Sequence, residues 1–215
     1  MSIQLLKKFR NNRCWSSIDS EEVNFFLNSD QSNFKNIVSL AINNEKDYSW
    51  RAAWLLTRIL NKNDKRLRSF ILKIIKSISG KESGHQRELL KIVSKFKLSK
   101  KQEGYLLDIC VNIWEDINIK SGTRYYAMLS ILNISKRYPD IRNEIDYLIG
   151  DYYTKTLSPG IKCNIFKKAN KNPLNCVGFF LVEQRGGKSK HFDGDLYELL
   201  PSDDCIASTI IKNKL

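Results

Sequence analysis

Residues 49–56 read SWRAAWLL, and this stretch decides the fold because three later segments repeat its pattern. The related segments are GHQRELLKI at 84–92, GTRYYAML at 122–129 and GIKCNIF at 160–166. Each segment carries a basic residue in register, at spacings of 36, 37 and 38 residues: Arg51, Arg87, Arg124 and Lys162. Three positions after each cation stands a residue expected in the core: Trp54, Leu90, Ala127 and Ile165. A repeat of about 37 residues that holds two helices predicts a stacked α-solenoid.

Apolar residues before and between these segments follow helical spacing. Stripes at i, i+3, i+4 and i+7 run through 34–42, 67–78 and 106–117, and the alternation typical of strands is missing. In the last stripe we expect Leu106, Ile109 and Ile113 to be buried. The full pattern predicts ten helices, near 3–12, 20–28, 32–44, 49–62, 65–79, 85–97, 100–118, 122–138, 141–154 and 159–170.

Helix start signals agree with these stripes. Ser20, Asp64 and Ser121 each precede a periodic run, where a side-chain oxygen can accept a backbone N–H. Ser99 is followed three residues later by Gln102, the spacing of a capping box. Ser158 precedes Pro159, a favoured pair at the first turn of a helix.

The basic-x-x-apolar opening of each second helix resembles the HEAT-repeat family of the armadillo-type fold, including small bacterial HEAT-repeat proteins. Residues 30–170 carry the resemblance, and 1–29 look like an atypical capping hairpin. The resemblance implies an all-α, α–α superhelix of about five helical hairpins over 1–171, followed by an irregular C-terminal extension over 172–215. The family usually places an Asp shortly before the basic residue. Asp47 fits that place, but the equivalent positions are Ser83, Lys120 and Ser158.

The net charge of +13 favours anionic partners such as nucleic acid, acidic lipid headgroups or acidic proteins. A second interpretation of the charge remains open. The chain has 25 Lys against 11 Arg and is rich in Asn and Ile, which is the composition that AT-rich coding sequence produces without selection for a ligand.

Several function classes lack support in the sequence. The five cysteines form no CxxC pair and the two histidines lie far apart, so we expect no metal site and no cofactor. No P-loop, GxSxG, HExxH or dinucleotide fingerprint occurs, so we expect a protein that is not an enzyme. The sequence shows no signal peptide and no apolar run of about 20 residues, which favours a cytoplasmic protein without a membrane span.

The four cations in register are the leading candidates for a binding site. Each lies near the first turn of its helix, where the helix dipole disfavours a cation by about 0.3–1 kcal/mol. Either a carboxylate or carbonyl of a neighbouring repeat or an external anion should compensate them. We expect Trp54 and Trp114 to lie in the core and His85 to lie on the surface. The candidate binding residues are Arg51, Arg87, Arg124, Lys162, Trp50, Arg58 and Lys91.

These residues favour a non-catalytic adaptor whose concave helix face binds a protein partner. The alternative is a DNA- or RNA-binding protein related to the alkyl-purine DNA glycosylases, which are basic HEAT-like proteins of similar length. Those enzymes use Trp, Asp and Arg on the concave face, whereas no Trp-x-x-x-Asp cluster occurs here.

Overall fold

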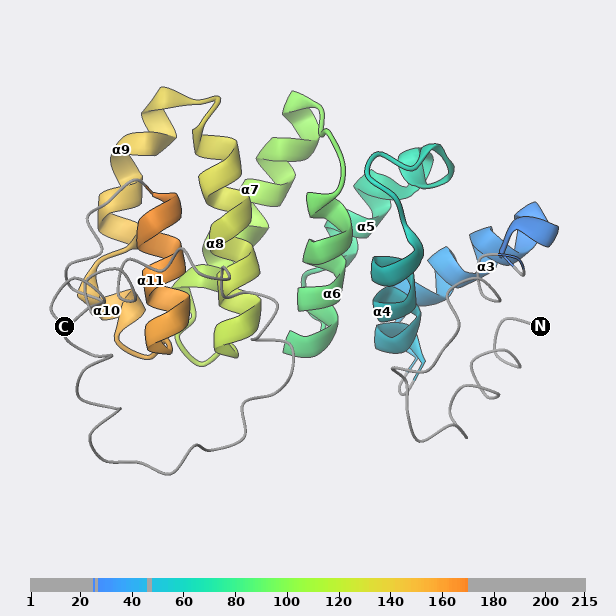
Figure 1. Ribbon diagram of the computed structural model, residues 1–215, viewed down its shortest axis with the longest axis horizontal. Helices are drawn as coiled ribbons and strands as arrows, with labels where there is room; N and C mark the ends of the chain where they lie inside the picture. Colours follow the sequence, from blue (N-terminus) through green and yellow to red (C-terminus); the bar gives the residue numbers. More distant parts are fainter. Residues whose placement is uncertain (1–24, 26, 46–47, 170–215) are drawn as a thin grey trace, which may run out of the picture. The chain divides into compact units, whose positions relative to one another are not determined.

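The computed structural model describes residues 25, 27–45 and 48–169, and the structural statements below concern only these. All their regular structure is helical, and no strand occurs among them (Figure 1). The chain is an all-α solenoid, as the repeat predicts. The expected helix at 3–12, the capping residue Ser20, Asp47 and the extension at 172–215 lie outside the described residues.

Three helical hairpins follow one another up to residue 143. The first pairs α3 (Gln31–Ile42) with α4 (Ser49–Ile59), and the third pairs α7 (Lys100–Glu115) with α8 (Ser121–Ser135). Between them, η2 (Lys65–Phe70) and α5 (Ile71–Ser77) form the first arm of a hairpin with α6 (Ser83–Ser94). First arms pack on one another, α3 against α5 and α5 against α7. Second helices do the same, α4 against α6 and α6 against α8 (Figure 1).

The chain divides into two compact units between Asn143 and Glu144, which we describe separately. Helix α9 (Pro139–Leu148) crosses the boundary, and α10 (Asp151–Thr154) and α11 (Pro159–Lys168) belong to the second unit. The single helix expected at 141–154 is wrong, because Gly150 is extended (φ −60°, ψ 163°) and separates α9 from α10. The division expected between residues 171 and 172 stays a prediction.

The local start signals are mostly confirmed. Asp64 accepts the backbone N–H of Arg66 at 3.0 Å, and Ser99 and Gln102 form the capping box. Lys120, not Ser121, is the N-cap of α8, so the expected cap is wrong by one residue. Ser158 is the N-cap before Pro159 at the start of α11, although its side chain makes no capping bond.

The repeated core positions are confirmed in three of the four repeats. Leu90, Ala127 and Ile165 are buried, whereas Trp54 is only half-buried. In α7, Leu106 and Ile113 are buried as expected, but Ile109 is half-buried. The reason is the phase of that helix, whose buried stripe is centred one position further along: Leu106, Cys110, Ile113 and Trp114.

Candidate binding surface on the second helices

One side of the second helices carries aromatic and basic side chains that are partly open to solvent. On α4, Trp50, Trp54 and Arg58 recur every four residues and therefore share a face. On α6, Arg87 and Lys91 have the same spacing and are half-buried. Trp50 is 43% exposed. With two neighbours, these residues form what we call the second-helix surface: Trp50, Arg51, Trp54, Arg58, Arg87, Lys91 and Tyr126.

Cations lie over aromatic rings along this surface. The Arg58 guanidinium lies 4.5 Å from the centroid of the Trp54 ring, and the Arg51 guanidinium lies 5.4 Å from that of Trp50. Lys91 Nζ of α6 lies 5.2 Å from the Tyr126 ring of α8, so this contact joins two repeats. Each such contact stabilises by about 0.5–1 kcal/mol at exposed sites. The stacking holds the cations beside flat apolar area.

The three second helices approach closely enough to share this surface. Thr57 of α4 donates its hydroxyl to the carbonyl of Glu88 in α6 at 3.4 Å. Between α6 and α8, Arg87 passes beside Gly122, where an added Cβ would lie 3.7 Å from Arg87 Cδ. Arg87 of α6 therefore lies beside the first turn of α8.

Glu88 is a buried carboxylate inside this basic surface, and the sequence pattern did not predict it as a site residue. It is 1% exposed, and its Oε1 accepts Arg87 Nε at 3.0 Å and Lys91 Nζ at 3.4 Å. Its Oε2 has no hydrogen-bond partner. Its position in the sequence could have indicated this role, because Glu88 follows Arg87 directly, precedes Lys91 by three residues and adjoins the core pair Leu89 and Leu90. Glu88 neutralises part of the charge of α6.

Arg124 interrupts the row of cations, because it is 1% exposed and belongs to the core. Its Nε donates to the carbonyl of Trp114 at 2.9 Å, and its guanidinium lies 4.7 Å from the Trp114 ring. Burial lowers the pKa of Arg124, while Asp116 opposes that shift. Trp114 lies in the last turn of α7, where the helix dipole is negative. Arg124 therefore lies against the negative end of α7, with the Trp114 carbonyl as a hydrogen-bond acceptor.

Lys162 lies in α11 of the second unit and is half-buried. The second-helix surface is confined to the first unit. Of the three cations in register within the first unit, Arg51 and Arg87 therefore lie on this surface, whereas Arg124 is in the core.

Where the family usually has a carboxylate, Ser83 joins two repeats by neutral hydrogen bonds. Its Oγ accepts the backbone N–H of Lys120 at 3.3 Å, and its carbonyl accepts the hydroxyl of Thr123 at 2.7 Å. These bonds tie the start of α8 to the start of α6. The equivalent contact of Asp47 lies outside the described residues.

Two lysines bridge repeats by covering the ends of helices. Lys81 Nζ donates to the carbonyls of Ile42 and Asn43 at 2.6 and 2.8 Å, at the end of α3. Lys95 Nζ donates to the carbonyls of Thr57 and Leu60 at the end of α4. Burial lowers the pKa of both lysines. Some of the lysines that make the chain basic therefore have a structural role, because they bind the ends of helices.

His85 is buried, so its expected place on the surface is wrong. It is 7% exposed, and its Nε2 lies 2.8 Å from the carbonyl oxygen of Ala41 in the last turn of α3. Burial lowers the pKa of His85, and the hydrogen bond to Ala41 opposes this shift. The imidazole thus joins Lys81 in closing the end of α3.

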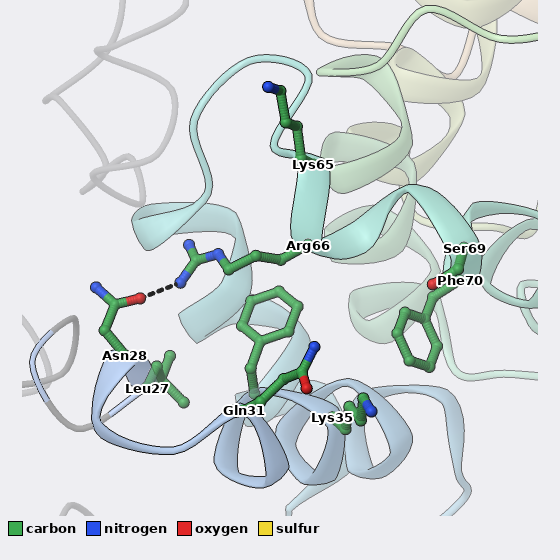
Figure 2. A pocket seen from close by; sticks show the side chains of 9 residues that line it. Leu27, Asn28, Gln31, Lys35, Lys65, Arg66, Ser69 and Phe70 are labelled. Carbon is green, nitrogen blue, oxygen red and sulfur yellow. Dashed lines mark hydrogen bonds between the residues drawn. The ribbon is translucent and has the colours of Figure 1, made fainter.

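A cavity of ≈ 390 Å³ lies between α3 and η2, and Figure 2 shows the side chains around it. Its central cation, Arg66, already donates three side-chain hydrogen bonds. It contacts Asp64 at 2.7 and 3.1 Å and Asn28 at 2.6 Å, and its guanidinium lies 4.5 Å from the Phe34 ring. We assign this cluster a structural role in joining the two hairpins.

The described residues hold no group of three or more His, Cys, Asp or Glu side chains that could bind a metal ion. Burial raises the pKa of the Cys110 thiol to about 12, with an opposing hydrogen bond from Ser130, so this thiol stays protonated near neutral pH. Among the described helices, none combines the length and the apolar composition that crossing a bilayer requires.

Comparison with known proteins supports one assignment. A family model described as a HEAT repeat domain matches residues 11–170, which is well over half of the chain. Searches of curated proteins and of solved structures returned no match. The matched range covers the three hairpins, their layered packing and the whole second-helix surface. The chain belongs to the HEAT-repeat family.

Proposed function

We propose that this protein is a non-catalytic adaptor that binds an acidic segment of a protein partner on its second-helix surface. HEAT repeats generally mediate protein interactions, and stacked repeats present extended surfaces for that purpose. The second-helix surface supplies both of the chemistries that such a partner needs, namely flat aromatic area and cations that are exposed (Arg58) or half-buried (Arg51, Arg87 and Lys91).

The observation that carries this proposal is the placement of cations over aromatic rings across three adjacent helices. Arg58 lies over Trp54, and Lys91 of α6 lies over Tyr126 of α8. Trp, Tyr and Arg are the residues that contribute most to binding energy in protein interfaces. Because the rings hold the cations in place, less side-chain entropy is lost when a carboxylate binds them.

A nucleic-acid partner is the second candidate, and the net charge of +13 favours it. The exposed ring of Trp50 could stack on an unpaired base. Against this, Glu88 neutralises part of the charge of Arg87 and Lys91, and Arg124 is in the core. A phosphate-tracking groove engages more cations than the surface offers.

A capture experiment with matched variants tests the adaptor role. Arg58→Ala/Lys91→Ala removes two cations of the second-helix surface, and Lys73→Ala/Lys101→Ala removes two exposed cations of the first helices as a control. We expect the first variant to lose a partner that the wild type and the control both retain. Equal retention by both variants would contradict the proposal.

Salt dependence separates the two candidates. Anisotropy titrations with single- and double-stranded DNA and RNA, each at low and at high salt, measure nucleic-acid affinity. If nucleic acid is the partner, a plot of the logarithm of affinity against the logarithm of salt concentration should have a negative slope of about 0.9 per phosphate contact. The adaptor role predicts weak nucleic-acid binding that Arg58→Ala/Lys91→Ala and Lys73→Ala/Lys101→Ala reduce alike. A selective loss with Arg58→Ala/Lys91→Ala would favour the nucleic-acid role.

A further inference from the structure

The two helix layers begin differently. Each first arm starts at a residue whose side chain accepts a backbone N–H: Asp30, Asp64 and Ser99. The second helices α4, α6 and α8 start at Tyr48, Glu82 and Lys120, none of which makes a side-chain capping bond. The first N–H groups of a helix have no partner within the helix. The second helices therefore begin with donors that no N-cap side chain covers, although the first of them in α4, the N–H of Ser49, donates to the carbonyl of Glu45 at 3.1 Å.

Two of these helix starts line one cavity of ≈ 500 Å³. Ser49 and Trp50 border it from α4, and Gly84 and Arg87 border it from α6. A Cβ added at Gly84 would meet no atom within 4 Å, so the first turn of α6 faces open space there. Helices α4 and α6 have 11 and 12 residues, long enough for a full dipole at each start.

Ser49 gives an independent indication of a ligand in this cavity. Its side chain is buried at 2% exposure, and its Oγ has no hydrogen-bond partner. A buried hydroxyl without a partner costs about 1–3 kcal/mol. Rotation about χ1 moves Oγ among three staggered positions. A ligand acceptor in the cavity would give this hydroxyl the bond that the protein does not.

The charges around the cavity favour an anion by a small margin. Lys81, Arg87 and Lys120 border it, as do Glu45 and Glu82. Lys81 donates to the end of α3 and Arg87 to Glu88, which leaves Lys120, exposed at the start of α8, as the most adaptable cation. Both carboxylates and Lys120 are exposed, so solvent and salt screen all three charges. The helix starts add positive potential that is preorganised.

We propose that this cavity binds a phosphate group, either as free phosphate or as the phosphate of an ester. The residues that carry these donors line the cavity: the first turns of α4 and α6, with Ser49 among them, and Lys120 at the start of α8. Such a donor set suits the three terminal oxygens of a phosphate better than the two of a carboxylate. The site shares Trp50 and Arg87 with the second-helix surface but does not rest on the proposed adaptor function.

Calorimetric titration of the full chain tests this site, with sodium phosphate and glycerol phosphate as probes at constant ionic strength set by chloride. We expect Ser49→Ala to weaken phosphate binding about tenfold, since a bond to a charged group is lost. Lys120→Ala should weaken it about two- to fivefold, and Glu82→Gln should strengthen it. The control variant Lys136→Ala removes an exposed lysine at the other end of α8 and should leave the phosphate affinity unchanged.

Two results would overturn the proposal. One is the absence of phosphate binding, or binding that is equal in Ser49→Ala, Lys120→Ala and the wild type. The other is a lower melting temperature of Ser49→Ala without phosphate, because removing a hydroxyl that has no partner should leave stability equal or raised.

The two probes identify the source of the phosphate. Tighter binding of the ester, lost in Trp50→Ala, identifies an organic phosphate whose body lies against Trp50; equal binding identifies phosphate alone. Trp54→Ala should leave both affinities unchanged, which separates this site from the adaptor surface.

Discussion

Arg124→Ala is expected to destabilise the protein far more than removal of an exposed arginine. Arg124 occupies the same register position as Arg51 and Arg87, yet it is 1% exposed. Its Nε bonds to the carbonyl of Trp114 at 2.9 Å, and its guanidinium lies 4.7 Å from the Trp114 ring. The alanine variant therefore leaves a buried carbonyl without this donor and an indole ring without its cation.

The magnitude follows from these two contacts. A hydrogen bond to a charged group contributes about 1.5–3 kcal/mol, and a desolvated cation–π contact about 2 kcal/mol. Removing a cation from the positive start of α8 relieves an unfavourable interaction with the helix dipole, which stabilises the variant by about 0.3–1 kcal/mol. The free energy of unfolding should thus fall by about 2.5–4.7 kcal/mol. Arg58→Ala, which removes an exposed guanidinium from the Trp54 ring, should lower it by only about 0.5–1 kcal/mol.

Urea unfolding followed by circular dichroism measures both variants against the wild type. The Arg124→Ala midpoint should fall with an unchanged slope, and the melting temperature should drop by about 5–15 °C. Arg124→Lys keeps the charge but not the planar guanidinium donor. Its stability should therefore lie between those of the wild type and Arg124→Ala. If Arg124→Ala were as stable as Arg58→Ala, the assignment of Arg124 to the core would be refuted.

Three further predictions concern the packing of the repeats. Ile113→Ala should cost about 2–5 kcal/mol in urea unfolding, since Ile113 is 4% exposed; a near-neutral result would mean that the helix phase is misassigned. Lys95→Ala should lower the melting temperature more than Lys97→Ala, because only the Lys95 side chain donates to the end of α4; equal losses would contradict that role. Burial lowers the pKa of His85 below the ordinary histidine value of about 6.5, so the unfolded chain takes up the proton first as the pH falls. Stability should therefore be full above about pH 6.5 and decline as the pH falls below it, and His85→Gln should flatten that part of the profile measured by melting at several pH values.

Much of the fold could be predicted because its signals are local. The boundaries of α7 and the capping box of Ser99 and Gln102 depend on residues within a few positions of each other. The break at Gly150 was missed because a single glycine inside a helical stripe is usually tolerated. The phase of α7 was misjudged by one position at Ile109, because neighbouring residues of an apolar stripe differ in burial only once packing partners are known.

The candidate site was harder to predict because charge alone does not reveal its partner. Arg51 and Arg87 lie on the second-helix surface, whereas Arg124 does not, and no local pattern separates the three. Lys81 and Lys95 look like ordinary surface lysines in the sequence. Each becomes structural because the end of a helix in the preceding repeat comes within reach of its ammonium group.

The sequence by itself determined the two-helix repeat, its period and most helix boundaries, because these depend on apolar spacing and capping along a continuous stretch of chain. Only the tertiary structure decided which cations face solvent and which are buried. The groups that bind them lie elsewhere in the chain, the Trp114 carbonyl 10 residues from Arg124 and the Ile42 carbonyl 39 residues from Lys81. The free energy of a buried charge depends on those distant partners, so identical register positions acquire different roles once the helices pack.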